Sequence, residues 1–553
     1  MKTIGGIMLF VLGADAAVAA VIFHAWQPAA LWFATAIPAV VLASRGCIAQ
    51  TLADRAGWKL GTATELSNPD RPRRVAQAVL SWDMLDLGLI AIGAPGSGKT
   101  DSVMLGHIDA LRRRRPHGGW AFFDGKGDVD TYRKCVGMGR APDHFFSSEL
   151  PGSESVNLLE GAPHDVIDRL SKVLIGTTES TSFYMDEQRA VLARMVPLLR
   201  RLPVATSLRD LYVALSMKDA GNELLRRARS AGADPAEITL ARQWLDQPFA
   251  TRTRNISGLL NRLFIFVAGP CADRLNAYAP DIRISALVGG GESLFVHLPL
   301  TAFARDVAIA LVEMFGVEAR RRQIERMGMP DSYALLFDDW GAFFHEGFGP
   351  FSARCRSARM PLAFGFQSHA QLRAIGAGYA DELDDTVATK MILRVQGEGT
   401  ARYAAHLLGQ HDALDLGTRR WTGGTGVSLQ FTRRYRVNER MLREMQPGEA
   451  YVSTLERGPE GIRNPLWRLR LGLPEFGPWK SIALPVARPA GAAVGLDFWS
   501  RYMNPRALAE FHRSVAREHA QLDAEAAIRC RDARCEAFGD RDANPGLDPE
   551  WGA

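Results

Sequence analysis

Residues 93–100 constrain the fold and chemistry of this 553-residue chain more than any other segment. They match the pattern G-x-x-x-x-G-K-[ST] in full, and the apolar run 85–92 (LDLGLIAI) that leads into them predicts a buried strand. Glycines let such a loop curl so that its N–H groups face phosphate oxygens, and the helix that follows aims its positive N-terminus at the same place. The segment is Gly93-Ala94-Pro95-Gly96-Ser97-Gly98-Lys99-Thr100.

Two side chains of this loop have defined partners in a bound nucleotide. We expect Lys99 to reach the β and γ phosphates of ATP and Thr100 to offer its hydroxyl to Mg²⁺, while the other loop residues supply backbone N–H groups. The alternative is a plain glycine turn. The complete pattern, placed directly after a predicted strand, favours phosphate binding.

A nucleotide hydrolase with such a loop also needs a second buried strand that ends in a carboxylate. The segment 333–339 (YALLFDD) fits, because an apolar run leads directly into Asp338 and Asp339. We expect Asp338 to be the metal-side carboxylate and Asp339 to be the general base or the group that orients the attacking water. Acidic strand ends are common, so this prediction depends on the phosphate-binding loop upstream.

A third buried strand is predicted at 361–366 (PLAFGF), and it is followed by Gln367 and Ser368. A polar side chain at that point, on a strand beside the phosphate-binding loop, can sense the γ phosphate. The alternative is that Gln367 caps a turn. Residues 293–298 (SLFVHL) predict one more core strand, so we expect an α/β fold.

The amino end carries two apolar runs, at 3–23 and 29–43. The first can span a bilayer and the second is marginal, since about 20 apolar residues are needed. Lys2 precedes the pair and the next basic residue is Arg45, so by the positive-inside rule both ends stay in the cytoplasm. The sequence therefore predicts a two-helix transmembrane anchor over residues 1–48, with the N-terminus and the body on the cytoplasmic side.

A cleaved signal peptide is the alternative for the first run, and the small residues at 14–20 partly fit one. The second apolar run, which follows at once, favours the anchor. Asp15 lies within the first predicted span, where a carboxylate is costly in lipid. It either faces a partner helix or marks the border of the span.

The composition excludes some functional classes. The net charge is only +5, from 66 basic and 61 acidic residues, which is too little for a histone-like polycation. The six cysteines are too few and too scattered for a disulfide framework, and they show neither a Cys-x-x-Cys pair nor zinc-ligand spacing. We therefore expect a reduced body that faces the cytoplasm.

Between residues 181 and 265 the strand signals vanish and apolar residues recur at helical spacing. Pro203, Pro235 and Pro248 divide this window into short helices. It holds twelve Arg and one Lys against eight Asp and Glu, so the window alone carries a net charge of +5. Basic helices of this kind fit nucleic-acid phosphates, and they fit ordinary solvated helix faces equally well.

Two further helical segments are predicted, at 303–327 and at 505–537. The four arginines at 112–115 end the helix predicted after the phosphate-binding loop. There they suit either a phosphate partner or the negative end of the helix dipole. For the tail beyond residue 480 we expect disorder or a surface helix.

Taken in order along the chain, these elements resemble the TraD/TraG-like coupling proteins of type IV secretion and bacterial conjugation. The most specific stretch is 367–372 (QSHAQL), which resembles the family's Q-S-x-x-Q-L signature. Three other stretches carry the resemblance. They are 122–128 (FFDGKGD), which resembles a strand end with D-P-K-G-E, 157–159 (NLL), which resembles N-P-L, and 397–401 with 407–409, which resemble E-T-A and L-L-G.

The resemblance implies a RecA-like P-loop NTPase domain interrupted by an inserted all-α domain, a two-helix membrane anchor, and assembly as a homohexamer. It implies ATP hydrolysis with Mg²⁺ that delivers DNA, with its attached relaxase, to a type IV secretion channel in the bacterial inner membrane. The DNA is expected to be single-stranded and bound without base readout. The expected partners are therefore DNA, relaxase, channel components, the membrane and further copies of the chain.

Several positions depart from the family pattern or carry two interpretations. Asp339 stands where the family usually has glutamate, so its efficiency as a base is open. Lys126 is either a phosphate sensor or part of a glycine turn. Arg356 best fits the family's spacing for an arginine that completes the site of the neighbouring subunit, with a solvated helix face as the alternative. The expected catalytic residues are Lys99, Asp338, Asp339, Arg356 and Gln367.

Five segments follow from these assignments. They are the anchor at 1–48, the first part of the nucleotide-binding domain at 49–180, the inserted all-α domain at 181–265, the second part of the nucleotide-binding domain at 266–480, and a C-terminal tail at 481–553. The leading hypothesis is a motor that moves single-stranded DNA or a nucleoprotein through a ring.

Other functions fit parts of this pattern. A membrane receptor that docks secreted protein effectors would use ATP without moving DNA. Translocases of the FtsK/HerA type share the loop, but those of chromosome segregation usually carry more membrane spans and a winged-helix DNA reader, neither of which the sequence contains. Secretion ATPases that power channel assembly place a long domain before the loop, whereas here Gly93 follows the predicted anchor closely.

Overall fold

The computed structural model describes most of the chain. The described residues are 57–114, 119–139, 141–175, 183–325, 332–339, 341, 348–373, 377–421, 424–458, 461–486 and 493–539. The chain forms two compact units, each built from separate stretches of sequence. The sheet unit is Met1–His144 with Ser285–His297 and Glu318–Leu484, and the helical unit is Phe145–Ile284 with Leu298–Val317 and Pro485–Ala553.

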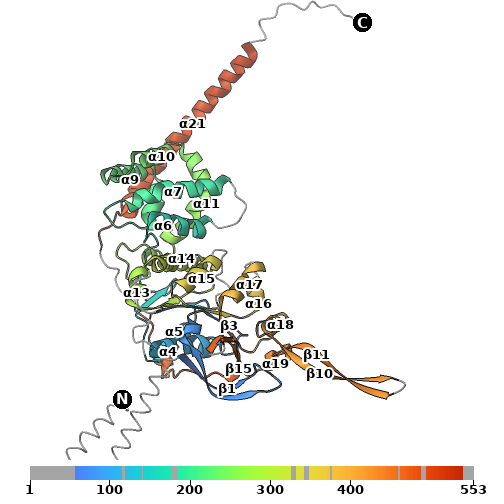
Figure 1. The fold of residues 1–553 in the computed structure, drawn as a ribbon. Coiled ribbons are helices and arrows are strands. Elements are labelled where there is room, and N and C mark those ends of the chain that lie inside the picture. The colour runs from blue at the N-terminus through green and yellow to red at the C-terminus, as the bar shows by residue number, and fades with distance from the viewer. Residues whose placement is uncertain are drawn as a thin grey trace, which may run out of the picture. The chain divides into compact units, whose positions relative to one another are not determined.

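A mixed β-sheet forms the centre of the sheet unit (Figure 1). Within this unit the strands follow the order β2-β1-β15-β12-β9-β3-β8-β7-β4-β6. Neighbours from β9 to β6 run parallel, and the rest pair antiparallel. The parallel strands are β3 (Leu89–Ile92), β4 (Trp120–Asp124), β6 (Ser293–His297), β7 (Ala334–Asp338), β8 (Leu362–Phe366) and β9 (Thr389–Ile392). The antiparallel strands are β1 (Gly57–Glu65), β2 (Arg73–Ser81), β12 (Glu449–Ser453) and β15 (Leu466–Arg470).

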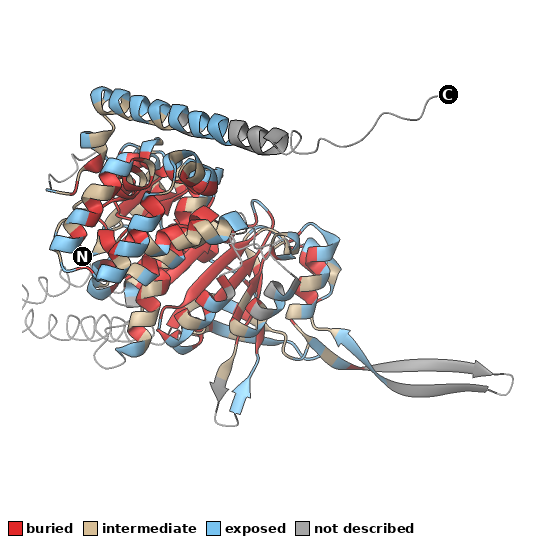
Figure 2. Cartoon of the chain, turned by 90° about the horizontal axis from the view of Figure 1, so that it is seen from above, coloured by how far each residue is buried: buried red, intermediate tan, exposed pale blue. Residues whose placement is uncertain are grey.

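The parallel strands β3, β4, β6, β7 and β8 are buried along their whole length (Figure 2). They consist mainly of apolar residues, as strands covered on both faces do. Aromatic rings pack across neighbouring strands, with ring centroids 4.8 Å apart between Phe123 and Phe337 and 5.5 Å apart between Phe337 and Phe364. Because parallel strands end at the same edge of a sheet, this core brings the residues that follow β3, β4, β7 and β8 together.

The predicted α/β fold is confirmed, and one strand begins later than expected. The run 85–92 is predicted as one strand, but only Leu89–Ile92 forms β3. The preceding residues Trp82–Leu85 form the short helix α3, and Gly88 turns the chain with a φ of 93°. This left-handed conformation favours glycine and interrupts an extended strand. The strands predicted at 293–298, 333–339 and 361–366 correspond to β6, β7 and β8.

Several helices and two hairpins complete the sheet unit. The helices are η1 (Lys99–Met104), α4 (Leu105–Arg114), α5 (Val129–Gly137), α15 (Phe348–Ser357), α16 (His369–Arg373), α17 (Ala377–Thr386), α18 (Glu398–Leu407) and α19 (Glu439–Arg443). A long hairpin of β10 (Gln410–Trp421) and β11 (Gly424–Tyr435) projects from this unit (Figure 1). A short hairpin joins β13 (Glu456–Gly458) to β14 (Gly461–Arg463).

The helical unit contains the window where helical spacing was expected. Its helices include α6 (Pro163–Leu170), α7 (Phe183–Arg200), α8 (Leu208–Ser216), α9 (Lys218–Ser230), α10 (Pro235–Leu245), α11 (Phe249–Ala268) and α12 (Ala272–Leu275). Pro235 occupies the first turn of α10 and Pro248 directly precedes α11, where the fixed φ of proline suits a helix start. The helix predicted at 303–327 is α14 (Ala302–Ile324).

The tail is docked on the helical unit where it begins. Short helix α20 (Phe498–Tyr502) follows a segment that the buried Asp210 holds in place. Asp210 accepts hydrogen bonds from the Phe498 N–H at 2.9 Å and from the Tyr278 hydroxyl at 3.1 Å. Beyond it, α21 (Pro505–Gly539) is mostly exposed, as expected for a surface helix. The expectation of disorder is therefore wrong for 493–502, because a buried carboxylate anchors that segment.

A second carboxylate clamps α20, and its effect should depend on pH. Burial opposes ionisation of Glu223, but hydrogen bonds from Tyr502, Arg501 and Arg227 outweigh it and lower its pKa to about 2. The ordinary pKa of a glutamate is about 4.3. The ionised Glu223 therefore stabilises the fold fully above about pH 4.3, and this stabilisation is lost as the pH falls toward 2. We expect Glu223→Gln to lower the free energy of unfolding by about 1 kcal/mol at pH 7.

The measurement is denaturant unfolding of the native chain and of Glu223→Gln between pH 7 and pH 3. The difference between the two should shrink as the pH falls. A difference that stays constant with pH would contradict the assigned role of the ionised carboxylate.

Among the described residues, no helix is long and apolar enough to cross a membrane. The anchor predicted at 1–48 lies outside the described residues.

Candidate functional site

The loop after β3 has the backbone geometry of a phosphate-binding loop. Gly96 and Gly98 have φ values of 71° and 98°, a region that favours glycine, and they curl the chain between β3 and η1. The neighbouring strands anchor the loop on both sides. The Gly93 N–H donates to the carbonyl of Phe366, the last residue of β8, at 3.1 Å, and the Ala94 N–H donates to the Arg394 carbonyl after β9 at 2.9 Å.

Four predicted residues meet at the carboxyl edge of the sheet. The buried Lys99 Nζ donates to Asp339 Oδ1 at 2.5 Å, and the Thr100 hydroxyl donates to Asp338 Oδ2 at 2.5 Å. Both contacts join residues about 240 positions apart in sequence, so the fold itself creates them. Burial raises the pKa of Asp338, and the repulsion from Asp339 adds to the rise.

Lys126 joins the same cluster. Its Nζ lies 2.7 Å from Asp339 Oδ2 and 3.4 Å from Thr100 Oγ1, so a lysine approaches Asp339 from each side. Burial works against ionisation of Asp339, but Lys99 and Lys126 outweigh it and lower its pKa. A carboxylate held this way is a weak base, and it is well placed to accept a hydrogen bond from a water molecule.

Asp124 is a site residue that sequence analysis did not single out. It ends β4 directly opposite Asp338 of β7, and it is completely buried. Its two oxygens accept the backbone N–H groups of Lys126 at 3.0 Å and Asp128 at 2.8 Å, which shapes the turn that presents Lys126. Burial and the charge of Asp338 raise the pKa of Asp124 to about 7. The sequence signal that could have revealed Asp124 is a carboxylate at the end of another apolar run.

The structure places the other two predicted catalytic residues differently. Gln367 follows β8, the parallel neighbour of β3, and it therefore lies at the edge that carries the loop. Its N–H donates to Oε1 of Gln371 at 2.9 Å, within the Q-S-x-x-Q-L segment. Arg356 is exposed on α15 beside Gly88 and Pro361, which precede β3 and β8. Arg356 thus lies at the opposite edge and does not meet Lys99 within one chain.

The residues at this edge fit Mg²⁺. Asp338 Oδ1 is buried and has no hydrogen-bond partner among the described residues, which leaves one carboxylate oxygen for a water ligand of the metal. Mg²⁺ usually keeps several waters and takes one or two protein oxygens together with phosphates. Thr100 and Asp338 can supply that small set. No group of three or more metal-ligating side chains occurs in the described part of the chain.

Comparison with a protein-family model identifies part of the chain. Residues 345–447 match the family described as the TraM recognition site of TraD and TraG. This segment includes the Q-S-x-x-Q-L stretch. The resemblance to the TraD/TraG-like coupling proteins is confirmed. No curated protein matches the chain.

Three solved structures, two of the coupling protein TrwB and one of VirB4, are similar to this chain. The plasmid coupling protein TrwB, in complex with a non-hydrolysable ATP analogue, matches with a TM-score of 0.50 and 15% identity, over 75% of this chain and 91% of that chain. An unbound form of TrwB that lacks its N-terminus matches with a TM-score of 0.49 and 16% identity, over 72% of this chain and 89% of that chain. VirB4 of Thermoanaerobacter pseudethanolicus matches with a TM-score of 0.44 and 11% identity, over 75% of this chain and 96% of that chain.

Proposed function

We propose that this protein is an ATPase that couples a DNA–relaxase substrate to a type IV secretion channel and drives conjugative DNA transfer. The observation that carries the proposal is the cluster in which Lys99 and Thr100 meet Asp339 and Asp338, in a chain that matches the TraD and TraG model. The cofactors are ATP and Mg²⁺.

The chain's own groups have distinct tasks in hydrolysis. Backbone N–H groups of the loop and the Lys99 ammonium hold the phosphates, and Lys126 adds a second positive charge beside them. Thr100 and Asp338 would hold Mg²⁺, which would supply positive charge to neutralise the phosphates. Asp339 orients the attacking water, and Gln367 contacts the γ phosphate from the neighbouring strand. ATP binding therefore requires both lysines to exchange Asp339 for phosphate oxygens.

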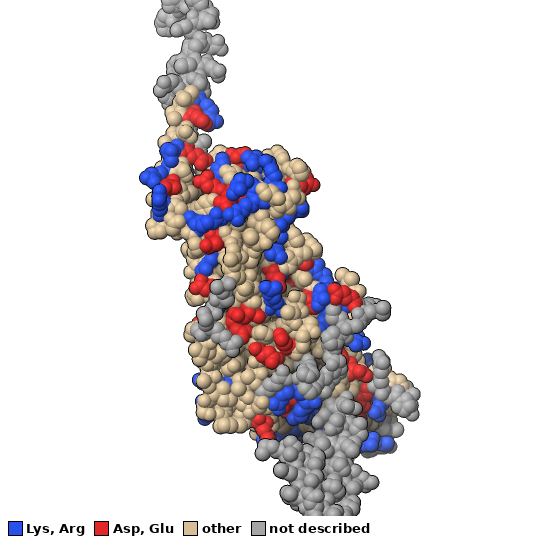
Figure 3. All heavy atoms as spheres, turned by 90° about the vertical axis from the view of Figure 1, so that its left-hand side faces the viewer, with Lys and Arg blue, Asp and Glu red and all other residues tan. Residues whose placement is uncertain are grey.

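Exposed arginines of the helical unit support a nucleic-acid partner. Basic side chains gather on the helical part of the face in Figure 3, with acidic side chains among them. Many are neutralised internally, as in the ion pair of Arg227 with Glu223 at 2.6 Å. Arg229, Arg242 and Arg254 are exposed, and no ion pair joins them to another described residue. We assign non-specific contacts with DNA phosphates to this group.

The remaining features of the proposal concern assembly and location. The protein is a homohexamer of the bacterial inner membrane, anchored by two spans within 1–48, with its ATPase body in the cytoplasm. The relaxase and channel components are its protein partners. The division into a nucleotide-binding domain at 49–180 and 266–480, an inserted all-α domain at 181–265 and a tail at 481–553 belongs to the same proposal.

Arg356 is assigned to the active site of the neighbouring subunit. Its exposed position, remote from the loop of its own chain, is compatible with a contact made between subunits. We expect Arg356→Ala to lower the turnover rate for ATP by a factor on the order of 10³ while leaving the Kd for ATP unchanged, because such an arginine acts on charge that develops during phosphoryl transfer. Steady-state hydrolysis and equilibrium binding measure the two effects. Arg359→Ala is the control, and normal turnover in Arg356→Ala would reject the assignment.

The proposal is tested by DNA-stimulated ATP hydrolysis with the full chain in detergent or nanodiscs. Single-stranded DNA should raise the turnover rate, and the apparent affinity for DNA should fall with salt, since phosphate contacts release counterions. Substituting Arg229, Arg242 and Arg254 together by glutamine should remove the stimulation. An ATPase that ignores DNA and responds to a secreted protein would instead identify the receptor for protein effectors.

A further inference from the structure

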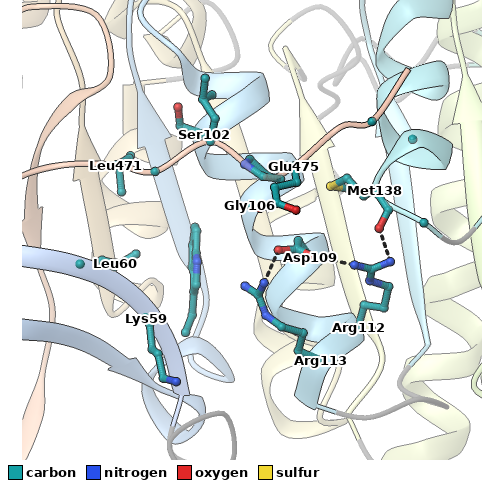
Figure 4. Close-up of a pocket in the computed structure, with 18 of the residues that line it drawn as sticks. Lys59, Leu60, Ser102, Gly106, Asp109, Arg112, Arg113, Met138, Leu471 and Glu475 are labelled. Atoms are coloured by element: carbon teal, nitrogen blue, oxygen red, sulfur yellow. Dashed lines mark hydrogen bonds and ion pairs between the residues drawn. The ribbon is translucent and has the colours of Figure 1, made fainter. Parts of the chain in front are cut away.

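Strands β3 and β8 both lead into the nucleotide site, but the chain continues differently after each of them. After β3, the loop runs into η1 and α4, which together cover residues 99–114. On this helix Asp109 pairs with Arg112 at 2.9 Å and with Arg113 at 2.6 Å, and Arg112 also donates to the Met138 carbonyl after α5 (Figure 4). The residues that begin the helix are therefore held by its whole length.

The segment after β8 leads into a much shorter helix. Gln367 and Ser368 are followed by α16, which has only five residues. A helix of little more than one turn is unstable on its own, because too few hydrogen bonds offset the ordering of the chain. Gln367 is half-buried and thus still accessible to a ligand. Its position therefore depends on the contacts that α16 makes with other elements of the sheet unit.

Gln371 holds the backbone of Gln367. Its Oε1 accepts the Gln367 N–H at 2.9 Å, and its own N–H donates to the Ser368 carbonyl at 3.1 Å. A Cβ on Gly341 would lie 2.9 Å from the Cβ of Gln371, so the chain after β7 passes directly against this side chain. Gly341 follows Asp339 by two residues. Gln371 therefore contacts the chain that follows β7 as well as the chain that follows β8.

Helix α18 holds the first residue of α16. The His369 ring stacks on the Tyr403 ring, with centroids 3.9 Å apart and an angle of 11° between the planes. The His369 N–H also donates to Thr400 Oγ1 at 3.2 Å, about one turn earlier on α18. His369 lies only two residues after Gln367. Movement of the start of α16 would therefore separate the two rings and break this hydrogen bond.

The polar edge of Tyr403 is held as well. Its hydroxyl donates to the Asp384 carboxylate, whose two oxygens both lie 2.7 Å away. The Asp384 carbonyl accepts a hydrogen bond from Lys390 Nζ at 3.1 Å. Asp384 belongs to α17 and Lys390 belongs to β9, which pairs with β3 on the side opposite β8. The stack on His369 is therefore tied to the strands on both sides of β3.

We propose that His369 and Tyr403 are positioning residues that hold Gln367 against the γ phosphate. This inference rests on the proposed ATPase function, in which Gln367 contacts that phosphate. The pairing of β8 with β3 fixes the start of the segment around Gln367, and the stack fixes its end. A misplacement of about 1 Å at a reacting group can lower the rate on the order of 100-fold. Loss of the stack therefore lowers kcat, while the loop and Lys99 still bind ATP.

The test compares removal of a ring with exchange of a ring in the full chain. Tyr403→Ala and His369→Ala should each lower kcat about tenfold and change the Kd for ATP less than about twofold. His369→Phe keeps a ring that can stack on Tyr403, so its kcat should stay within about threefold of the native value. Steady-state hydrolysis and calorimetric binding measure the two quantities.

A matched control lies on the same helix. Arg402 is exposed and pairs with Glu398 at 2.7 Å and with Glu439 at 3.2 Å, so Arg402→Ala should change neither kcat nor Kd. Thermal unfolding identifies a variant that does not fold. His369→Ala carries the test if Tyr403→Ala fails to fold, because the removed ring is only half-buried.

A double-mutant cycle shows whether the stacked pair acts through Gln367. Gln367→Ala alone should lower kcat, and adding Tyr403→Ala or His369→Ala should lower it no further. The inference is overturned if the ring variants keep the native kcat, if they weaken ATP binding as much as turnover, or if their loss is equally large without Gln367. Native kcat in Gln367→Ala would overturn both its phosphate contact and this inference. A native chain that does not hydrolyse ATP would instead overturn the proposed function.

Discussion

Replacing Lys99 with alanine should abolish ATP turnover and weaken ATP binding, with a loss of kcat/KM on the order of 10²–10³-fold. Lys99 is 5% exposed and directed at the carboxyl edge of the sheet, where it is held by Asp339. Without its charge, the loop keeps only dipolar N–H groups and the more exposed Lys126 to hold the phosphates. The measurements are calorimetric binding of MgATP and hydrolysis by the full chain.

A mating assay extends this test to the cell. Lys99→Ala in place of the native protein should abolish DNA transfer, whereas Lys218→Ala should not, because Lys218 makes only an exposed ion pair with Asp246 in the helical unit. Thermal unfolding of both variants checks that the fold is intact. Undiminished DNA transfer by Lys99→Ala would reject the motor function outright.

Asp338→Asn should separate binding from chemistry. The amide keeps the shape of Asp338 and can still accept the hydrogen bond from Thr100, but it lacks the charge that holds a hydrated Mg²⁺. We expect kcat to fall by a factor on the order of 10² while the Kd for ATP changes only a few-fold, because the loop still binds the phosphates.

Stopped-flow binding and steady-state hydrolysis at several Mg²⁺ concentrations measure the two quantities. Asp273→Asn is a suitable control, since Asp273 is an exposed partner of Arg209 in the helical unit. A kcat within fivefold of the native value would show that Asp338 does not hold the metal.

The parts of the site that sequence analysis predicted are those that a short segment determines. The loop 93–100 and the pair Asp338 and Asp339 each follow a buried apolar strand, so their secondary structure and their place at a strand end could be read locally. The meeting of Lys99 with Asp339 depends instead on strand order, and the order is a property of the whole sheet. Local patterns predict strands, but they do not say which strands become neighbours.

The same reason explains what was missed. Asp124 acts through its register with Asp338 and through two backbone N–H groups of the next turn, and neither is visible in a linear pattern. The early start predicted for β3 arose because Leu85 and Leu87 are apolar, although Gly88 requires a turn between them and the strand. The docked tail segment depends on Asp210, almost 290 residues upstream of its partner Phe498.

The central position of β3 has a consequence for synthesis of the chain. Leu89 pairs with Ala363 of β8 and with Thr389 of β9, which are 274 and 300 residues further along. At about 5–20 residues per second, a ribosome would need roughly 15–60 s to deliver these partners after β3 has been made. The nucleotide loop therefore remains without either flanking strand until the second half of the protein emerges. A product truncated before β8 could not assemble a site, so an interrupted chain would carry no ATPase activity into the cell.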